Sequence, residues 1–399
     1  MLIEFSVSNF RSFKNKVILS MVSKRNKELI EQTFDLNKNI KLLKSIVIYG
    51  SNSGGKSNLL TAFSYLEYLI LKSFNSDGEK VIKNEYYLFD EKFKKIPTEF
   101  VIDFYQNNIY FRYSLSTLNK KVYYECLEVK EKNKKNIKLF ERNQQKFNIS
   151  KDFEFAQKYS EDVAEDVLLV SNIFRTENNY IKNFKEWFLK LEMLNYGDTF
   201  YEIFQNKVNI KKIKNDATYK KELLSFLKGA DEEIIDLSFK TITHLDKEGN
   251  EEKEDVLFYS HKLENSTKEL LEVSIQKLSD GTQKILKLFD NLYSLKEKGG
   301  ILFVDELDAK LHPLLVEKVV EYVQNHKNSQ LIITLHNHYL LDNQKFRRDA
   351  IYFVKKINGT SKLKTLYDLK DKNGNRVRND ALYHKEYLDK KYDKYFENE

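Results

Sequence analysis

The first part of the chain alternates apolar and polar residues in the manner of β-strands. Residues 2–7 and 16–21 each show this alternation, and residues 9–15, Asn-Phe-Arg-Ser-Phe-Lys-Asn, lie between them. Two alternating runs separated by a short segment predict a β-hairpin. Residues 98–140 continue the alternation and predict a β-meander, because strands that follow one another through short turns pair antiparallel. The strands expected there are residues 100–105, 109–115 and 122–129.

The pattern changes to buried strands and helices at residue 45. Residues 45–49 are nearly all apolar and end at Gly50, whereas residues 58–74 place apolar side chains at helical spacing. A buried strand, a glycine turn and a helix are therefore expected in that order. The last third of the chain alternates in the same way, which is typical of the α/β class with a parallel core. The elements expected there are a helix at 282–296, a strand at 301–304, a helix at 314–323 and a strand at 330–335.

Helical spacing dominates the middle of the chain. Residues 151–230 carry amphipathic stretches, which predict an inserted helical lobe. These stretches are residues 163–174, 181–194 and 219–227. Residues 234–244 and 256–262 then return to strand-like alternation. We therefore expect three parts, namely an N-terminal lobe at 1–150, the helical insertion at 151–230 and a C-terminal lobe at 231–399.

Composition narrows the classes of protein to which this chain can belong. Hydrophobic residues make up 41% and charged residues 32%, which is enough apolar material for a core and excludes a disordered chain. The one cysteine, Cys126, excludes an intramolecular disulfide and a cysteine zinc cluster, and it favours the reducing cytoplasm. The sequence shows neither a signal-peptide pattern nor a run of roughly 18 apolar residues, so we expect no membrane contact.

Net charge leaves contact with nucleic acid open. The chain has 67 lysine and arginine residues against 60 acidic residues, which gives a net charge of +7. An excess of this size permits a nucleic-acid surface. Because the acidic residues are nearly as numerous, an ordinary solvated surface explains the same composition.

Residues 50–57 read Gly-Ser-Asn-Ser-Gly-Gly-Lys-Ser and match the phosphate-binding pattern G-x-x-x-x-G-K-[ST]. An apolar strand precedes the segment and an amphipathic helix follows it, as this motif requires; a glycine-rich turn without nucleotide is the alternative. In such a loop the glycines let backbone N–H groups curl around phosphate, Lys56 reaches the β- and γ-phosphates, and the Ser57 hydroxyl ligates Mg²⁺. The expected nucleotide-binding residues are Gly50, Ser51, Asn52, Ser53, Gly54, Gly55, Lys56, Ser57 and Asn58.

A second apolar strand ends in two acidic residues. Residues 301–304 are Ile-Leu-Phe-Val, and Asp305 and Glu306 follow them. We expect Asp305 to hold the Mg²⁺ shell and Glu306, one residue beyond the strand, to act as the general base on the attacking water. About 250 positions separate Lys56 from Asp305, which indicates a large insertion and argues against small kinases and GTPases.

Two further polar segments flank this strand in the sequence. Residues 278–284, Leu-Ser-Asp-Gly-Thr-Gln-Lys, open a predicted helix, where the Ser279 hydroxyl and exposed N–H groups can bind an anion. An ordinary helix N-cap is one interpretation, and binding to the γ-phosphate held by a second copy is the other. His336 follows the strand at 330–335 and is placed to donate to a γ-phosphate, although a lone histidine usually has no such role.

Together these motifs resemble the ABC-type ATPase head. The segments that carry the resemblance are the 50–57 loop, Leu-Ser-Asp-Gly-Thr-Gln at 278–283, Val-Asp-Glu-Leu-Asp at 304–308, Leu-His-Pro at 311–313, and His336. Asn-Phe-Arg-Ser-Phe at 9–13 resembles the opening of the RecF, SMC and overcoming-lysogenization-defect group. Within that group the arrangement is similar to AAA family ATPases of bacterial abortive-infection and anti-phage systems, such as the ATPase subunits of PARIS, Septu and AbiL.

The resemblance implies a P-loop NTPase fold, namely an α/β ABC-type head with an antiparallel β-subdomain and the inserted helical lobe. ATP would lie between two heads, with Lys56 and Ser57 from one copy and Ser279 and Gly281 from the other, so that a dimer or higher oligomer is part of catalysis. Arg11 matches a family residue near the nucleotide, and an exposed arginine in a turn is the alternative. The implied catalytic residues are Lys56, Glu306 and His336, and the implied Mg²⁺ ligands are Ser57 and Asp305.

Two positions depart from the family pattern. His312 stands seven positions after Asp305, where the family usually has an aspartate, as in the Leu-His-Pro variants of the group. Communication between heads can then use different contacts. No glutamine of a Q-loop can be placed; Glu85 and Asp90 lie in the corresponding region.

The sequence thus predicts a cytoplasmic, Mg²⁺-dependent ATPase that closes and reopens a dimer through ATP binding and hydrolysis. By family analogy, the switch controls a separate nuclease or toxin effector of an anti-phage system. Too few residues follow His336 for a Toprim nuclease, so we expect no nuclease activity in this chain. A RecF-like ATPase that clamps DNA and a nucleotide-dependent scaffold with negligible turnover are the alternatives. Lysines and aromatics interleave at 383–396, which favours packing on the head, with contact to a partner or nucleic acid as the alternative.

Overall fold

The computed structural model describes residues 1–74, 80–196, 208–245, 251–262, 270–371 and 373–397. The chain forms two compact units, each built from segments that are distant in sequence. Unit 1 comprises Met1–Leu194, Gly300–Asp305 and Lys327–Glu399, and unit 2 comprises Asn195–Gly299 and Glu306–His326. The division into three parts at residues 150 and 230 stays a prediction. Among the described residues, no helix combines the length and the apolar character that crossing a membrane requires.

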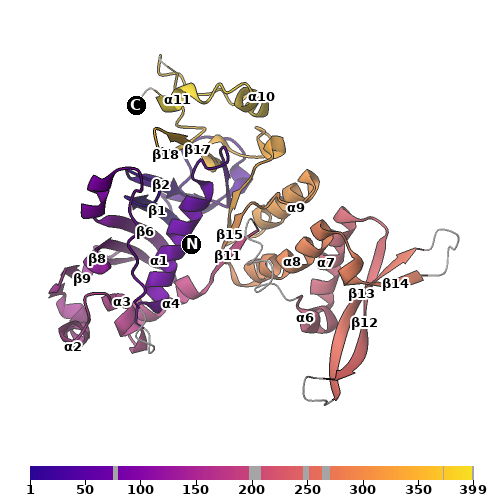
Figure 1. Ribbon diagram of the computed structural model, residues 1–399, viewed down its shortest axis with the longest axis horizontal. Helices are drawn as coiled ribbons and strands as arrows, with labels where there is room; N and C mark the ends of the chain where they lie inside the picture. The colour runs from indigo at the N-terminus through magenta and orange to yellow at the C-terminus, as the bar shows by residue number, and fades with distance from the viewer. Residues whose placement is uncertain (75–79, 197–207, 246–250, 263–269, 372, 398–399) are drawn as a thin grey trace. The chain divides into compact units, whose positions relative to one another are not determined.

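Unit 1 contains an antiparallel sheet of seven strands in the order β10-β9-β8-β7-β6-β1-β2 (Figure 1). The strands are β1 (Leu2–Ser8), β2 (Val17–Ser20), β6 (Thr98–Gln106), β7 (Ile109–Leu118), β8 (Lys121–Glu131), β9 (Ile137–Asn143) and β10 (Lys146–Ile149). Two-residue turns, Asn107–Asn108 and Asn119–Lys120, follow β6 and β7, and all four residues have positive φ, which suits tight hairpin turns. The predicted hairpin and meander are confirmed.

The second sheet of unit 1 has six strands in the order β11-β15-β16-β5-β17-β18. These are β5 (Ser45–Tyr49), β11 (Leu191–Asn195), β15 (Gly300–Asp305), β16 (Ser329–Thr334), β17 (Ile351–Ile357) and β18 (Thr360–Thr365). Strands β15, β16, β5 and β17 run parallel, and β18 pairs antiparallel with β17 at one edge. Every residue of β5 and β16 is buried, as expected for central strands of a parallel sheet. The predicted α/β class with a parallel core is confirmed.

Helix α1 (Lys56–Lys72) lies between the two sheets of unit 1 (Figure 1). The ring centroid of its Phe63 is 5.0 Å from that of Phe5 in β1 and 4.3 Å from that of Phe303 in β15. The other apolar side chains that α1 buries are Leu59, Leu60, Ala62, Leu66, Leu69 and Ile70. Because both sheets hold the helix, its N-terminus has a fixed position at the carboxyl end of β5.

The helical residues of unit 1 differ in part from the sequence prediction. They are η3 (Lys151–Ala156), α2 (Gln157–Glu161), α3 (Leu169–Asn172), η4 (Ile173–Arg175) and α4 (Asn179–Leu189). The helix predicted at 163–174 is therefore confined to short turns from residue 169, and the helix predicted at 181–194 ends at Leu189. Leu191–Asn195 instead forms β11 at the edge of the parallel sheet. Backbone pairing with β15 outweighs the helical spacing of these side chains.

A buried ion pair ties the short helices of unit 1 to the meander. Glu125 of β8 and Arg142 of β9 have fully buried side chains, and Nη1 of Arg142 lies 3.5 Å from Oε2 of Glu125. The Glu125 carboxylate also accepts the backbone N–H groups of Leu169 and Val170 at 2.8 and 3.0 Å. Arg142 donates to the carbonyl oxygen of Val167 at 2.6 Å. The pair therefore fixes the start of α3 against the sheet.

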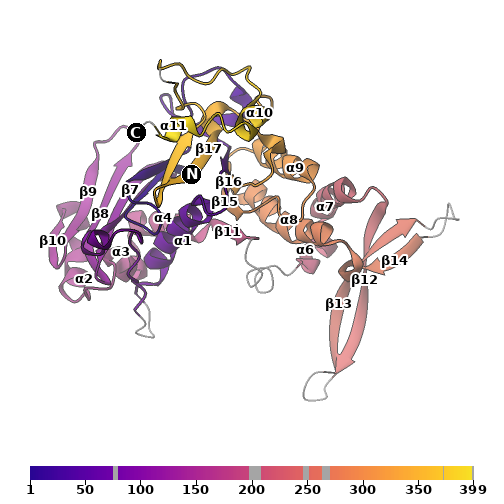
Figure 2. The ribbon, with the colours of Figure 1, turned by 45° about the horizontal axis from the view of Figure 1, so that its top comes forward.

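Unit 2 packs helices around an aromatic core and carries a small antiparallel sheet. Its described elements are α6 (Ile210–Asn215), α7 (Ala217–Ala230), β12 (Ile234–Leu245), β13 (Glu251–Lys262), β14 (Leu270–Ser274), α8 (Asp280–Lys298) and α9 (Pro313–Gln324). The ring centroid of Phe289 on α8 lies 5.1 Å from that of Tyr219 on α7 and 6.0 Å from that of Tyr322 on α9. Figure 2 shows β12 and β13 extending away from these helices.

The C-terminal residues of unit 1 pack on its parallel sheet. Tyr387 stacks on Phe353 of β17, with ring centroids 5.5 Å apart and an interplanar angle of 16°. Lys362 of β18 donates to the carbonyl oxygen of Phe396 at 3.1 Å. The segment 383–396 therefore contacts the parallel sheet of unit 1, in agreement with the packing interpretation.

The remaining elements of unit 1 are η1 (Ile30–Gln32), β3 (Thr33–Asp35), β4 (Lys41–Leu43), η2 (Glu91–Lys95), η6 (His338–Leu340), η7 (Arg348–Ala350), α10 (Tyr383–Leu388) and α11 (Lys394–Glu397). Unit 2 also has η5 (Ile275–Lys277).

Candidate nucleotide-binding site

Strand β5 and helix α1 flank the loop at 50–55, as the sequence predicts. Gly55, the N-cap residue of α1, has φ 119°, and a Cβ atom there would lie 2.6 Å from Oγ of Ser361. A Cβ atom at Gly50 would lie 2.3 Å from the carbonyl oxygen of Val354 in β17. The close approach of β17 and β18 to the loop therefore requires glycine at both positions.

The Lys56 side chain lies inside this loop and is only 5% exposed. Its ammonium donates to the carbonyl oxygen of Gly50 at 2.7 Å, and that of Ser51 lies at 3.4 Å. Ser57, in the first turn of α1, is exposed. The first N–H groups of a helix have no partner within the helix, and its dipole is positive at this end. The loop, Lys56 and the start of α1 together form a cradle suited to phosphate.

A polar network supports the loop from outside. Oγ of Ser361 donates to the carbonyl oxygen of Gly54 at 2.7 Å and lies 2.9 Å from Oγ of Ser12. Asn58 of α1 donates to the same Ser12 oxygen at 2.8 Å. Ser12 and Ser361 are buried, so these bonds are shielded from water. Neither serine was predicted from the sequence as a site residue, and nothing in the sequence near residue 361 indicates this contact.

Arg11 lies next to that network and carries an ion pair. Its Nε is 3.1 Å from Oε2 of Glu85, and its Nη2 is 3.3 Å from Oε1, so the pairing is bidentate. Arg11 has φ 47°, which places it in the left-handed region, and its N–H donates to the carbonyl oxygen of Tyr86. Glu85, one of two acids in the region where a Q-loop is expected, thus orients Arg11. A nucleotide contact by Arg11 stays a prediction.

Asp305 stands at the end of β15 with only 4% of its surface exposed. The hydroxyl of Thr334, at the end of β16, donates to Oδ1 of Asp305. Thr334 pairs in register with Ile48 of β5, and the three strands are parallel. Asp305 and the 50–55 loop therefore lie at the same carboxyl edge of the sheet. Asp305 is predicted from the sequence as a site residue, whereas Thr334 is not, because its contact with Asp305 depends on the strand order.

The donor set at this edge fits Mg²⁺. The Asp305 carboxylate and the Ser57 hydroxyl supply oxygen atoms, which are the ligands that Mg²⁺ prefers. No group of three or more His, Cys, Asp or Glu side chains in the described part of the chain is arranged to hold a metal. Mg²⁺ commonly binds through one or two protein ligands together with substrate phosphates and water, so a larger cluster is not required.

His336 follows β16 and is exposed. The next residue, Asn337, caps η6 by accepting the N–H of Tyr339 at 2.9 Å. This cap fixes the backbone immediately after His336. The imidazole therefore stands two residues beyond Thr334 at the carboxyl edge of the sheet, and its contact with a γ-phosphate stays a prediction.

The remaining predicted site residues belong to unit 2. Ser279 is the N-cap of α8, and its Oγ accepts the N–H of Thr282 at 3.2 Å. Ser279 is therefore a helix N-cap, as one of the two interpretations expected. Binding of an anion at this residue stays a prediction. Glu306 has φ 53°, a left-handed conformation that is uncommon for glutamate. His312, where the family usually has aspartate, is the N-cap of α9, and its Nδ1 accepts the N–H of Leu314 at 3.3 Å.

A pocket of about 280 Å³ lies beside the first residues of the loop. It is lined by Gly50, Ser51, Phe353, Val354, Lys355, Tyr387, Leu388, Lys390, Tyr392, Asp393 and Phe396. Tyr49 of β5 contacts Tyr387, with ring centroids 6.1 Å apart. The C-terminal segment is therefore in contact with the strand that carries the loop.

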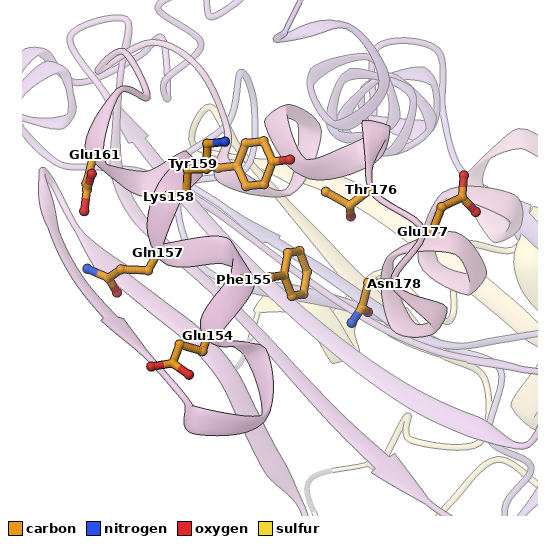
Figure 3. Close-up of a pocket in the computed structure, with 9 residues that line it drawn as sticks. All are labelled: Glu154, Phe155, Gln157, Lys158, Tyr159, Glu161, Thr176, Glu177 and Asn178. Atoms are coloured by element: carbon orange, nitrogen blue, oxygen red, sulfur yellow. The ribbon is translucent and has the colours of Figure 1, made fainter.

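A depression of about 830 Å³ lies among the short helices of unit 1 (Figure 3). Its lining residues are Glu154, Phe155, Gln157, Lys158, Tyr159, Glu161, Thr176, Glu177 and Asn178. Three carboxylates against one lysine disfavour a phosphate at this position, because like charges repel. None of the predicted site residues lines it.

The sequence and the fold were compared with those of known proteins. No curated protein matches the sequence. The structure is similar to the SMC head domain from Thermotoga maritima, with 14% identity, 91% of this chain and 98% of that chain covered, and a TM-score of 0.43. It is also similar to an SmcHead bound to the C-winged helix domain of ScpA, with 14% identity, coverage of 92% and 98%, and a TM-score of 0.45. A family profile matches residues 45–342, more than half of the sequence, and the chain therefore belongs to the family described as "AAA domain, putative AbiEii toxin, Type IV TA system".

Proposed function

We propose that this chain is an Mg²⁺-dependent ATPase whose nucleotide cycle drives association of two copies. The observation that carries the proposal is the buried Lys56 inside a glycine loop at the start of α1, at the same sheet edge as buried Asp305. Membership in a family described as an AAA domain supports a P-loop ATPase. In such a site the lysine and the helix N-terminus stabilise the negative charge of the phosphates.

Residues on the carboxyl edge of the sheet would hold the metal. Ser57 and Asp305 would be its ligands, and a bound Mg²⁺ would supply positive charge that offsets the negative charge of the phosphates. Thr334 orients the Asp305 carboxylate through its hydroxyl. Lys56 binds the β- and γ-phosphate oxygens, and His336 donates to the γ-phosphate.

Glu306 is the proposed general base. It directly follows Asp305, and its left-handed backbone turns the chain at that point. A carboxylate within reach of the attacking water accepts its proton as the bond to phosphorus forms. Replacing a general base of this kind lowers kcat by about 10²- to 10⁴-fold.

A second copy would complete the site. Ser279 and Gly281 open helix α8, whose N-terminal N–H groups can bind the γ-phosphate of ATP held by another chain. ATP then joins two heads, and hydrolysis releases them. We propose that this switch controls a separate nuclease or toxin effector in an anti-phage system, on the basis of the family to which the chain belongs.

A DNA clamp of RecF type is the second candidate function. The net charge of +7 favours it, because a basic surface attracts phosphate backbones. Stimulation of ATP hydrolysis by DNA distinguishes the two functions.

Phosphate release and molecular mass test the ATPase proposal together. Wild type should hydrolyse ATP, Lys56→Ala should lose ATP binding, and Glu306→Gln should bind ATP without releasing phosphate and show a doubled mass by light scattering. Glu297→Gln, an exposed glutamate on α8, is the matched control and should behave as wild type. Unchanged turnover in Glu306→Gln removes Glu306 from its role, and absence of ATP binding by wild type refutes the proposal.

A further inference from the structure

Lys284 of α8 is a buried lysine whose ammonium is bound to one loop of unit 2. Its side chain is only 5% exposed. Nζ donates to the carbonyl oxygens of Leu307 and Ala309 at 2.8 and 2.7 Å, and that of Glu306 lies at 3.3 Å. An ammonium has three N–H donors, and all three of these acceptors are backbone carbonyls of the segment 306–309. The Nζ atom also lies 3.9 Å from the ring centroid of Tyr196.

The same loop touches the N-terminus of α8 at a second place. A Cβ atom at Gly281 would lie 2.6 Å from the carbonyl oxygen of Lys310, so the two backbones are in close contact. Nζ of Lys310 also lies 3.5 Å from Oδ2 of Asp280. The loop 306–310 therefore contacts the start of α8 at both of its ends, through Lys284 near Glu306 and through Gly281 and Asp280 at Lys310.

This loop requires such support. Glu306 and Lys310 have φ values of 53° and 60°, and non-glycine residues in this region persist where surrounding contacts determine them. Burying a lysine ammonium is unfavourable unless its donors are satisfied. Three carbonyls and an aromatic face satisfy it here, whereas packing alone would need only an apolar side chain of similar length.

We propose that Lys284 is a positioning residue that couples the N-terminus of α8 to Glu306 of the same chain. The inference rests on the proposed function, in which Ser279 and Gly281 bind ATP held by the second copy while Glu306 acts on ATP held by its own copy. A shift of α8 when it binds the partner's nucleotide then moves Glu306 through Lys284. The two ATP sites of a dimer are thereby linked, and hydrolysis is cooperative.

The test replaces the ammonium and keeps the length of the side chain. Lys284→Met should lower kcat by about 10- to 100-fold, because a small displacement of a catalytic group has effects of this size. The Kd for ATP should stay within about twofold of the wild-type value, since the P-loop residues are unchanged. The Hill coefficient for ATP should exceed 1 in wild type and fall to 1 in the variant. Lys298→Met, on the exposed end of α8, is the matched control and should behave as wild type in all three measurements.

A second variant separates positioning from folding. Lys284→Arg keeps a cation with several N–H donors, so it should recover part of kcat and of the cooperativity. If Lys284→Met does not fold, the arginine variant decides the matter alone, with lowered kcat and unchanged Kd expected. Folded variants with wild-type kcat, or a wild-type Hill coefficient of 1, overturn the proposal. Equal losses of ATP binding and turnover also overturn it, since they indicate a structural role only. Absence of turnover in wild type refutes the ATPase function itself.

Discussion

Replacement of Thr334 by valine tests how the structure holds the proposed Mg²⁺ ligand Asp305. Thr334 is fully buried at the end of β16, and its hydroxyl donates to Oδ1 of Asp305 at the end of β15. Valine has nearly the same shape as threonine, so Thr334→Val removes the hydroxyl while the packing of the sheet is kept. The substitution therefore isolates one hydrogen bond to a buried carboxylate.

The expected effects follow from that bond. A hydrogen bond to a charged group contributes about 1.5–3 kcal/mol, and we expect the free energy of unfolding to fall by that amount at pH 7. The hydroxyl also fixes the rotation of the carboxylate. Loss of a group that orients a metal ligand typically weakens metal affinity by about 10- to 100-fold, so the Mg²⁺ concentration for half-maximal ATP turnover should rise by that factor.

Urea unfolding and the Mg²⁺ dependence of phosphate release measure these two quantities. Thr334→Ser is the matched control, because it keeps the hydroxyl and removes only the methyl group. It should lose some stability and retain the wild-type response to Mg²⁺. The reasoning is refuted if the valine variant keeps the wild-type Mg²⁺ dependence, or if the serine variant loses as much of it as the valine variant.

Two further predictions concern stability. Arg142→Met should lower the free energy of unfolding by about 3–5 kcal/mol, because it leaves the buried Glu125 carboxylate without its positive partner. Arg378→Met, which breaks a highly exposed ion pair, should change it by less than about 1 kcal/mol in the same urea titration, and equal effects would contradict the argument. Burial raises the pKa of half-buried Glu67 on α1 from 4.5 to about 7, so the folded state holds this proton more tightly than the unfolded state. Relative to Glu67→Gln, wild type should therefore lose up to about 3 kcal/mol as pH rises from 4.5 to 7, and a constant difference across that range would exclude this contribution.

Elements that depend on local pattern were predicted well from the sequence. The hairpin, the meander, β5, α1 and the strands and helices after residue 280 are confirmed, because each has a strong period and its own turn or cap residues. The region 151–195 was predicted less well. Leu191–Asn195 has helical spacing but forms β11, since the edge of β15 lies more than 100 residues away in sequence and no local pattern reports it.

Sequence alone indicated the proposed phosphate-binding loop, because the pattern G-x-x-x-x-G-K-[ST] is formed by consecutive residues. The proposed roles of Ser57, Asp305 and Glu306 come from the same kind of short motif. Tertiary structure alone decided which groups support them. Thr334 reaches Asp305 because β15 and β16 are neighbouring parallel strands, and Ser361 reaches the loop because antiparallel β18 forms the edge of the same sheet.

The supporting contacts outside the parallel sheet have the same origin. Glu85 meets Arg11 across 74 positions, and Lys284 meets the loop after Glu306 across more than 20. A buried polar side chain must find partners for its donors, and the chain supplies them from wherever the fold brings backbone carbonyls or carboxylates together. Sequence therefore specifies the groups proposed to react, whereas long-range packing specifies the bonds that hold them, because those bonds join residues with no shared local pattern.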